Sequence, residues 1–285
     1  MLVLLCWCSL AAAAGSISIP LREVAKGVAL PVISIGTWLA GTSEDPAAIV
    51  GNWTAQGGRG IDTALVYRDQ AKVAAAIAAQ RLRREEVYLT TKIPFCVGEA
   101  LAEVAIREDL NALNTTYVDL MLIHASVGID CPGTWRALEK YHAAGALRAI
   151  GVSNFKPAAL RQLMSAARVP IAVNQIDYSV LSHDEETIAF CRAHNITVEA
   201  YSPLGGAHSK GSVFSEPTVV AIASAHGVSA AQVAIRWIVQ RGDILTVLSG
   251  KAEHQVNDAD VFGFQLSDAE MQKLSQLADA DKQRS

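Results

Sequence analysis

The sequence has no excess of basic residues and few charged residues of either sign. Its 285 residues include 24 Lys and Arg against 28 Asp and Glu, which gives a formal net charge of −4. A chain without a basic excess has little to attract phosphate backbones, so we expect no nucleic-acid partner. Only 18% of the residues are charged while 51% are hydrophobic, a balance that excludes an intrinsically disordered chain.

The sequence also lacks an apolar run of about 20 residues, the length that a transmembrane helix needs. The apolar run at residues 2–14 ends in four alanines before Gly15. It fits the hydrophobic part of a secretory signal with a small-residue cleavage site, although the usual basic residues before it are missing. We treat residues 1–14 as a candidate targeting segment, with a disordered extension or a misplaced start as the alternative. The expected location is secretory or organellar with a functional signal and cytoplasmic without one, with no membrane partner.

Cysteines are few, and none of them follows a known pairing or metal-binding pattern. They are Cys6, Cys8, Cys96, Cys131 and Cys191, with no CxxC motif and no Cys/His spacing of a zinc site. Cleavage of the targeting segment would leave three cysteines, which cannot all pair. We therefore expect buried thiols in place of a disulfide framework, and no metal site.

From about residue 30 onward, short apolar runs alternate with Ala- and Leu-rich helical patterns. Such alternation predicts βαβ units and a parallel sheet. The expected strands are residues 32–37, 60–63, 87–93, 118–124, 148–152, 172–176, 197–201 and 244–248. The expected helices are residues 46–55, 70–80, 98–113, 134–144, 157–167, 184–194, 216–226, 230–240 and 268–277.

The number of strand–helix units indicates the topology. Eight units favour a (β/α)8 (TIM) barrel over the alternative, an open doubly wound sheet, and no G-x-G-x-x-G motif follows the first strand. No linker or shift in composition divides the chain after the candidate targeting segment. We expect residues 15–285 to form a single α/β barrel domain with a short C-terminal tail.

Titratable side chains follow three consecutive predicted strands. Asp62 and Tyr67 follow the second strand, Lys92 ends the third and His124 ends the fourth. Active sites of such barrels lie at the carboxyl ends of the strands, so these side chains should converge. Each alone has a simpler explanation, such as a surface ion pair or a helix cap, but four together on three strand ends are a specific chemical set.

The four groups suit the protonation of a substrate oxygen. A Tyr hydroxyl with a pKa near 10 is a poor acid at pH 7. An ammonium about 4 Å away would lower that pKa by up to about 3 units. We therefore expect Lys92 to lower the pKa of Tyr67, Asp62 to keep Lys92 charged, and His124 to orient a substrate oxygen.

Several segments resemble the aldo-keto reductase family in order, from about residue 28 to residue 275. Residues 58–67 (GRGIDTALVY) are similar to the segment with its catalytic Asp and Tyr, residues 90–94 (TTKIP) to its Lys motif, and residues 117–124 (YVDLMLIH) to its His strand. Further matches are residues 36–38 (GTW), 148–155 (RAIGVSNF), 173–175 (VNQ), 200–204 (AYSPL) and 232–237 (QVAIRW).

The resemblance implies a carbonyl reductase that binds a nicotinamide dinucleotide in a barrel. It makes Tyr67 the general acid, supported by Lys92, Asp62 and His124. The cofactor residues that it implies are Gly36, Thr37, Asp62, Ser153, Asn154 and Gln175, Tyr201 as a stacking ring, and Ser202, Pro203, Leu204 and Gly205 along the pyrophosphate.

The last cofactor segment departs from the family pattern. Leu248 stands at the usual Lys and His254 at the usual Arg, whose charges would hold a 2′-phosphate. Ser249 matches the family, Lys251 can substitute if the loop shifts, and Asp258 would accept a hydrogen bond from the adenine amino group. We expect NADPH as the cofactor, with NADH as the alternative because of these replacements.

The substrate pocket also departs from the family pattern. Ala125 replaces the family's Trp after His124, so a pocket bounded by Trp38, Tyr67, His124 and Ala125 should be open. Trp38 could instead pack against the barrel. The predicted protein is a monomer that reduces small aldehydes or ketones. The alternatives are a catalytically weak NADP(H)-binding redox sensor and a non-redox barrel lyase or isomerase.

Overall fold

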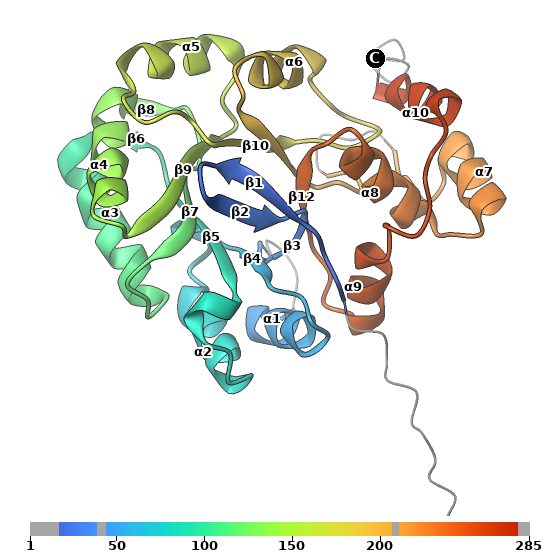
Figure 1. Cartoon of the computed structure of the whole chain (residues 1–285), viewed down its shortest axis with the longest axis horizontal. Helices are drawn as coiled ribbons and strands as arrows, with labels where there is room; N and C mark the ends of the chain where they lie inside the picture. Colours follow the sequence, from blue (N-terminus) through green and yellow to red (C-terminus); the bar gives the residue numbers. More distant parts are fainter. Residues whose placement is uncertain (1–16, 39–43, 207–210, 279–285) are drawn as a thin grey trace, which may run out of the picture.

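A closed barrel of eight parallel strands forms the centre of the molecule, with helices around it (Figure 1). The computed structural model describes residues 17–38, 44–206 and 211–278, so the candidate targeting segment lies outside the described residues. The predicted (β/α)8 barrel is confirmed, because β12 pairs with β3 and closes the sheet. The barrel strands are β3 (Ile33–Gly36), β4 (Gly60–Asp62), β5 (Tyr88–Ile93), β7 (Val118–Ile123), β9 (Leu147–Ser153), β10 (Val173–Asp177), β11 (Thr197–Tyr201) and β12 (Ile244–Val247).

The barrel strands begin and end within one residue of their predicted limits. All six residues of β7 are buried, as expected for a parallel strand covered on both faces. Polar residues follow at the carboxyl end of the barrel strands, where the chain leaves the barrel. Consequently, the titratable side chains predicted at the strand ends lie around the opening at the carboxyl end of the barrel.

Helices form the outer layer, and most follow the predicted pattern. α4 begins three residues early, because Asp130 accepts a hydrogen bond from the backbone N–H of Gly133 and caps it. α9 was not predicted. The helices are α1 (Pro46–Ala55), α2 (Gln70–Ala79), α3 (Glu99–Ala112), α4 (Cys131–Ala143), α5 (Pro157–Ala166), α6 (Glu185–Ala193), α7 (Pro217–His226), α8 (Ala230–Gln240), α9 (Ala252–Ala259) and α10 (Asp268–Ser275), with short 3₁₀ turns at Leu65–Tyr67 and Arg84–Glu86.

No single helix within the described ranges is long and apolar enough to cross a membrane. Only α7 and α8 taken together reach that length and composition, and the two are bent by 91° relative to each other.

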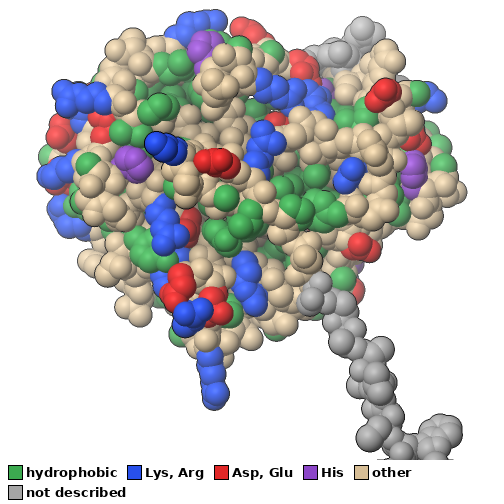
Figure 2. All heavy atoms as spheres, in the orientation of Figure 1, with side chains coloured by type: hydrophobic (Ala, Val, Ile, Leu, Met, Phe, Trp, Pro, Cys, Tyr) green, Lys and Arg blue, Asp and Glu red, His purple; other side chains and the backbone are tan. Residues whose placement is uncertain are grey.

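An antiparallel hairpin that the sequence did not predict covers the amino-terminal end of the barrel. It consists of β1 (Leu21–Ala25) and β2 (Val28–Pro31), and it lies across the barrel in Figure 1. Its Val24 and Leu30 pack into one buried cluster with Leu122 of β7. The hairpin therefore closes the barrel at this end. Basic and acidic side chains lie interspersed over this face of the molecule (Figure 2).

The expectation that the cysteines are buried thiols is wrong for two of them. Cys96 and Cys131 form a disulfide, whereas Cys191 is a buried free thiol. The disulfide joins the segments that follow β5 and β7, where a small parallel sheet also forms between β6 (Cys96–Val97) and β8 (Gly128–Asp130). β5 and β7 are neighbours in the barrel, so their exits bring together cysteines 35 residues apart in the sequence.

Candidate active site

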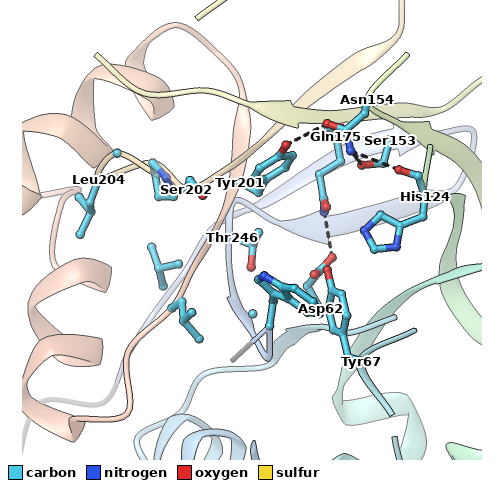
Figure 3. Close-up of a pocket in the computed structure, with 16 residues that line it drawn as sticks. Asp62, Tyr67, His124, Ser153, Asn154, Gln175, Tyr201, Ser202, Leu204 and Thr246 are labelled. Atoms are coloured by element: carbon cyan, nitrogen blue, oxygen red, sulfur yellow. Dashed lines mark hydrogen bonds between the residues drawn. The ribbon is translucent and has the colours of Figure 1, made fainter. Parts of the chain in front are cut away.

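A cavity of about 480 Å³ lies at the carboxyl ends of the barrel strands. It contains most of the predicted site residues, and Thr246, Val247 and Leu248 join them (Figure 3). Lys92 lies behind its wall, while Thr37, Ala125, Ser249, His254 and Asp258 do not line it. The lining residues are Gly36, Trp38, Asp62, Tyr67, His124, Ser153, Asn154, Gln175, Tyr201, Ser202, Pro203, Leu204, Gly205, Thr246, Val247 and Leu248.

A buried ion pair supports the Tyr67 hydroxyl. The Lys92 ammonium is fully buried, and its Nζ atom lies 2.5 Å from Asp62 Oδ1 and 3.4 Å from Tyr67 Oη. It also donates a hydrogen bond of 3.0 Å to the carbonyl of Thr63. Burial disfavours the charged ammonium, but Asp62 and Tyr67 outweigh it and raise the pKa of Lys92. Lys92 therefore stays charged beside the Tyr67 hydroxyl.

The expectation of a lowered pKa for Tyr67 is wrong. Burial raises the pKa of the Tyr67 hydroxyl, and the opposing charge of Lys92 does not overcome it. Tyr67 therefore holds its proton at neutral pH, as a proton donor must. Its ring lies 4.7 Å from that of Trp38, measured between ring centroids, so Trp38 forms part of the cavity wall.

His124 faces Tyr67 as a neutral imidazole. The two rings meet edge to face, with their centroids 5.6 Å apart. Burial, followed by the charge of Lys92, lowers the pKa of His124 to about 4. The backbone N–H of His124 donates to Ile93 and its carbonyl accepts from the Asn154 amide. At neutral pH the ring can therefore offer a hydrogen bond to a substrate oxygen without carrying a charge.

A row of polar side chains from β9, β10 and β11 forms the wall that begins beside His124, since β9 pairs with β7. Tyr201 donates its hydroxyl proton to Asn154 Oδ1 over 2.9 Å, and the Asn154 amide donates to Ser153 Oγ over 3.0 Å. The Gln175 amide donates to Asp62 Oδ2 over 2.8 Å, as Figure 3 shows. The sequence did not predict this last bond, which joins the predicted nicotinamide-binding residues to the catalytic ion pair.

The cavity has features that fit a nicotinamide dinucleotide. Thr246 Oγ1 is buried and has no hydrogen-bond partner among the described residues, although Thr246 lines the cavity. A Cβ atom on Gly36 would lie 2.9 Å from this oxygen, so glycine keeps the space open. The aromatic ring of Tyr201 and the run from Ser202 to Gly205 line the same space. These groups offer a stacking surface, polar partners and exposed backbone to a flat ring with an attached phosphate chain.

The predicted adenine-side residues lie beyond this cavity, on and before α9. His254 and Lys251 are exposed, whereas Asp258 is buried. Burial raises the pKa of the Asp258 carboxyl to about 7. Gln255, which the sequence did not single out, donates from its amide to the carbonyl of Ser249 and so fixes the loop before α9.

Glu199 is a buried acidic group near the site that the sequence reasoning missed. It lies on β11 directly beside Gln175 of β10, and its Oε2 atom has no hydrogen-bond partner among the described residues. Burial and the nearby Asp62 raise its pKa to about 7. A glutamate inside a buried strand was the signal that could have identified it.

No group of three or more His, Cys, Asp or Glu side chains in the described ranges is arranged to hold a metal ion. The geometry instead offers a neutral proton donor, Tyr67, next to the buried Lys92 ammonium, and a polar row that begins beside His124.

The family model described as "Aldo/keto reductase family" matches residues 32–279 of the chain. The chain is 37% identical to morphine 6-dehydrogenase of Pseudomonas putida over 271 residues, which cover 90% of this chain and 91% of that protein. It is 33% identical to glyoxal reductase of Bacillus subtilis over 254 residues, with 88% and 90% covered.

Solved structures show the same similarity. The aldo-keto reductase of Bombyx mori, determined in complex with NADP, superposes with a TM-score of 0.85 at 28% identity. The match covers 92% of this chain and 94% of that structure.

Proposed function

The chain belongs to the aldo/keto reductase family, and from this premise we propose that it reduces aldehydes or ketones with Tyr67 as the general acid. Family membership makes it an oxidoreductase for NAD(P)H-dependent reduction of small carbonyl compounds. The proposal concerns which residues act and how, since the relatives have different names and substrates.

The observation that carries the proposal is the protonated Tyr67 hydroxyl, 3.4 Å from a buried ammonium and lining the same cavity as His124. A carbonyl oxygen placed between the Tyr67 hydroxyl and the His124 ring would have a proton donor on one side and a neutral hydrogen-bond donor on the other. The ammonium of Lys92 favours the phenolate that remains once Tyr67 has given up its proton.

The ion pair of Asp62 and Lys92 supports proton transfer from Tyr67. A reduced nicotinamide held by the residues of the cavity would supply the hydride that the carbonyl carbon accepts. Tyr67 donates its proton from Oη to the carbonyl oxygen, and Lys92 stabilises the phenolate through its charge. Asp62 keeps Lys92 charged, although the Lys92 side chain is completely buried. His124 holds the carbonyl oxygen within reach of Tyr67 by a hydrogen bond.

We place the nicotinamide end of the cofactor against β9, β10 and β11. Ser153, Asn154 and Gln175 would hold the carboxamide, and the Tyr201 ring would stack on the nicotinamide. The polar row described above supports this assignment, as do the Thr246 hydroxyl, unpartnered among the described residues, and the space beside Gly36. The run of residues 202–205 would lie along the pyrophosphate.

We propose NADPH as the preferred form of the cofactor. The exposed ammonium of Lys251 and the exposed imidazole of His254 stand near the start of α9, where they could contact a 2′-phosphate. Ser249 would add a hydroxyl donor, and Asp258 would accept from the adenine amino group. The relative from Bombyx mori was determined with NADP, which favours the same choice.

The experiment that tests the function is a fluorescence titration with NADPH and with NADH, followed by reduction assays on a panel of aldehydes and ketones. We expect micromolar binding and measurable reduction. Tight binding without reduction of any carbonyl would favour the redox-sensor alternative. No binding of either dinucleotide would contradict the proposal and favour a lyase or isomerase.

We further propose that residues 1–14 direct the chain to an oxidising compartment. The Cys96–Cys131 disulfide supports this, because such bonds persist mainly outside the reducing cytosol. Sequencing the amino terminus of the mature protein tests it. A mature chain that begins at Met1 would contradict cleavage.

A further inference from the structure

We propose that Asp69 is a positioning residue for the reaction, because its buried carboxyl holds the turn with Tyr67 against Thr63, whose carbonyl binds Lys92. The proposal rests on the carbonyl reductase function given above. The turn, named here the Tyr67 turn (residues 64–68), lies between β4 and α2. Asp69 does not line the cavity, so it can act only through the residues that do.

The Tyr67 turn gives its own tyrosine little support. It is a single 3₁₀ turn, in which the backbone N–H groups of Tyr67 and Arg68 donate over 2.9 and 3.3 Å. Val66 and Arg68 are exposed. Arg68 also has a φ of +58°, a left-handed conformation that is uncommon for residues other than glycine. Contacts outside the turn must therefore help to hold Tyr67 in place.

The Asp69 side chain closes the base of this turn. Asp69 is 5% exposed, and its Oδ1 atom accepts a hydrogen bond of 2.6 Å from the hydroxyl of Thr63, six residues earlier. Thr63 is completely buried as well. A hydrogen bond in such surroundings is stronger than one in water. The two ends of the turn are thus joined side chain to side chain, with Tyr67 between them.

The direction of the Asp69 side chain is unusual for its place in the chain. Asp69 stands at the N-cap of α2, where an aspartate normally accepts a hydrogen bond from a backbone N–H of the first helical turn. Its side chain makes no such bond. Only its backbone carbonyl serves the helix, by accepting from Lys72 and Val73. The side chain instead turns back to Thr63 and serves the turn.

The Asp69 carboxyl is also incompletely compensated. Its Oδ2 atom is buried and has no hydrogen-bond partner among the described residues. Burial raises the pKa of this carboxyl. Because a buried polar atom without a partner costs free energy, stability alone is a poor explanation for an aspartate here. A role in holding the site explains it better.

Thr63 connects the turn to the ammonium of Lys92. The Thr63 carbonyl accepts from Lys92 Nζ over 3.0 Å, and its N–H donates to the carbonyl of Thr90 on β5 over 2.9 Å. Both sides of the 3.4 Å contact between Tyr67 Oη and Lys92 Nζ therefore depend on one residue. If the turn moved away from Thr63, this contact would lengthen, and the ammonium would stabilise the phenolate less.

The helix after the turn has an attachment of its own. The Gln70 amide donates to Asp109 Oδ1 over 3.0 Å, and the Thr91 hydroxyl donates to Asp109 Oδ2 over 2.6 Å. Loss of the Asp69 side chain should therefore release the turn and leave α2 on the barrel. The predicted nicotinamide-binding residues stand on β9, β10 and β11, which do not pair with β4. Cofactor binding should therefore persist.

The test measures steady-state reduction with NADPH and with the aldehyde, from the panel above, that the parent reduces fastest. For Asp69→Ala, we expect kcat to fall about 10- to 100-fold, the effect of a displacement of about 1 Å at a reacting group. The KM for the aldehyde and the dissociation constant of NADPH, from fluorescence, should each change less than about threefold. Asp69→Asn keeps an acceptor for the Thr63 hydroxyl, so it should retain kcat within about threefold of the parent.

Thr63→Val removes the donor of the same hydrogen bond and should lower kcat about as far as Asp69→Ala. The double variant Asp69→Ala/Thr63→Val should lose no more than the larger single loss, because both changes remove one contact. Thr54→Val is the matched control, since it removes a buried hydroxyl that donates to the carbonyl of Val50 within α1 over 2.7 Å. It should keep the parental kcat. Circular dichroism checks the fold of each variant.

Three results would each overturn the proposal: a parental kcat in folded Asp69→Ala or Thr63→Val, an equal loss in Asp69→Asn and Asp69→Ala, or additive losses in the double variant. Failure of both Asp69→Ala and Thr63→Val to fold would make the contact a requirement of folding and overturn it as well. All of these leave the reductase function standing. A parent that reduces no carbonyl would contradict that function itself.

Discussion

The two ends of the site hold their buried charges differently. At the catalytic end, Asp62 is paired with Lys92, and both are almost completely buried. At the adenine end, the buried Asp258 has no ion-pair partner among the described residues, and the side chains of Lys251 and His254 are exposed to solvent. The comparison teaches that barrel geometry fixes the catalytic end, whereas the loop before α9 allows the adenine end to vary.

This difference has a physical origin. Lys92, Asp62 and His124 stand on strands or directly after them, where the backbone ladder determines the direction of each side chain. Lys251 and His254 stand at the start of a short helix, after a loop that the side chains of Gln255 and Asn52 hold in place. Replacing a residue in such a loop disturbs few other contacts.

The comparison predicts the largest effect for Lys92→Met. Removing the ammonium leaves Asp62 buried without a partner, and breaking a buried ion pair costs about 3–5 kcal/mol of stability. Chemical denaturation measures this loss, and carbonyl reduction should also fall to background. The double variant Asp62→Asn/Lys92→Met should recover most of the stability and none of the activity. Equal stability of the parent and Lys92→Met would show that the pair is not buried as described.

Tyr67→Phe should give the next largest effect and separate chemistry from binding. Loss of the general acid should lower kcat by at least about 10²-fold. Removing a hydroxyl that faces the substrate should leave the dissociation constant of NADPH near the parental value. Steady-state kinetics and fluorescence titration measure the two quantities. A parental kcat in this variant would sink the assignment of Tyr67 as the acid.

The catalytic end could be predicted from the sequence because the positions of its residues are set by the ends of the barrel strands. Once eight strands are assigned, Asp62, Lys92 and His124 must point toward one opening. The pKa of Tyr67 could not be predicted in the same way, because its direction depends on how deeply the phenol is buried relative to its distance from the ammonium.

Other features depend on contacts between segments that are distant in sequence. The disulfide can be predicted only when Cys96 and Cys131 are known to follow neighbouring barrel strands. Their separation of 35 residues in the sequence does not reveal this. The hydrogen bond from Gln175 to Asp62 spans 113 residues. The β1–β2 hairpin has three exposed residues in its first strand, so it carries too weak an apolar pattern to predict.

Asp258→Asn tests the unpaired carboxyl of the adenine end. The folded protein raises the Asp258 pKa from its ordinary value near 4 to about 7. The carboxyl therefore contributes stability that is fully present below about pH 4 and is lost as the pH rises through about 7. The stability of the variant should depend less on pH, so that it gains up to about 4 kcal/mol relative to the parent between pH 4 and pH 8. Denaturation at several pH values measures it, and parallel pH profiles would contradict it.

The smallest effect is expected for His254→Ala, and it decides whether the adenine end recognises a 2′-phosphate. Interactions of an exposed side chain are weakened by solvent, so its removal should weaken NADPH binding only about two- to fivefold. NADH lacks the phosphate and should bind as before. Lys251→Ala is the matched control on the same loop, and the variant with the larger NADPH effect identifies the side chain that replaces the lost clamp. Equal effects on NADPH and NADH in both variants would mean that the phosphate is held elsewhere, and the contrast between the two ends would then concern only the buried carboxyls.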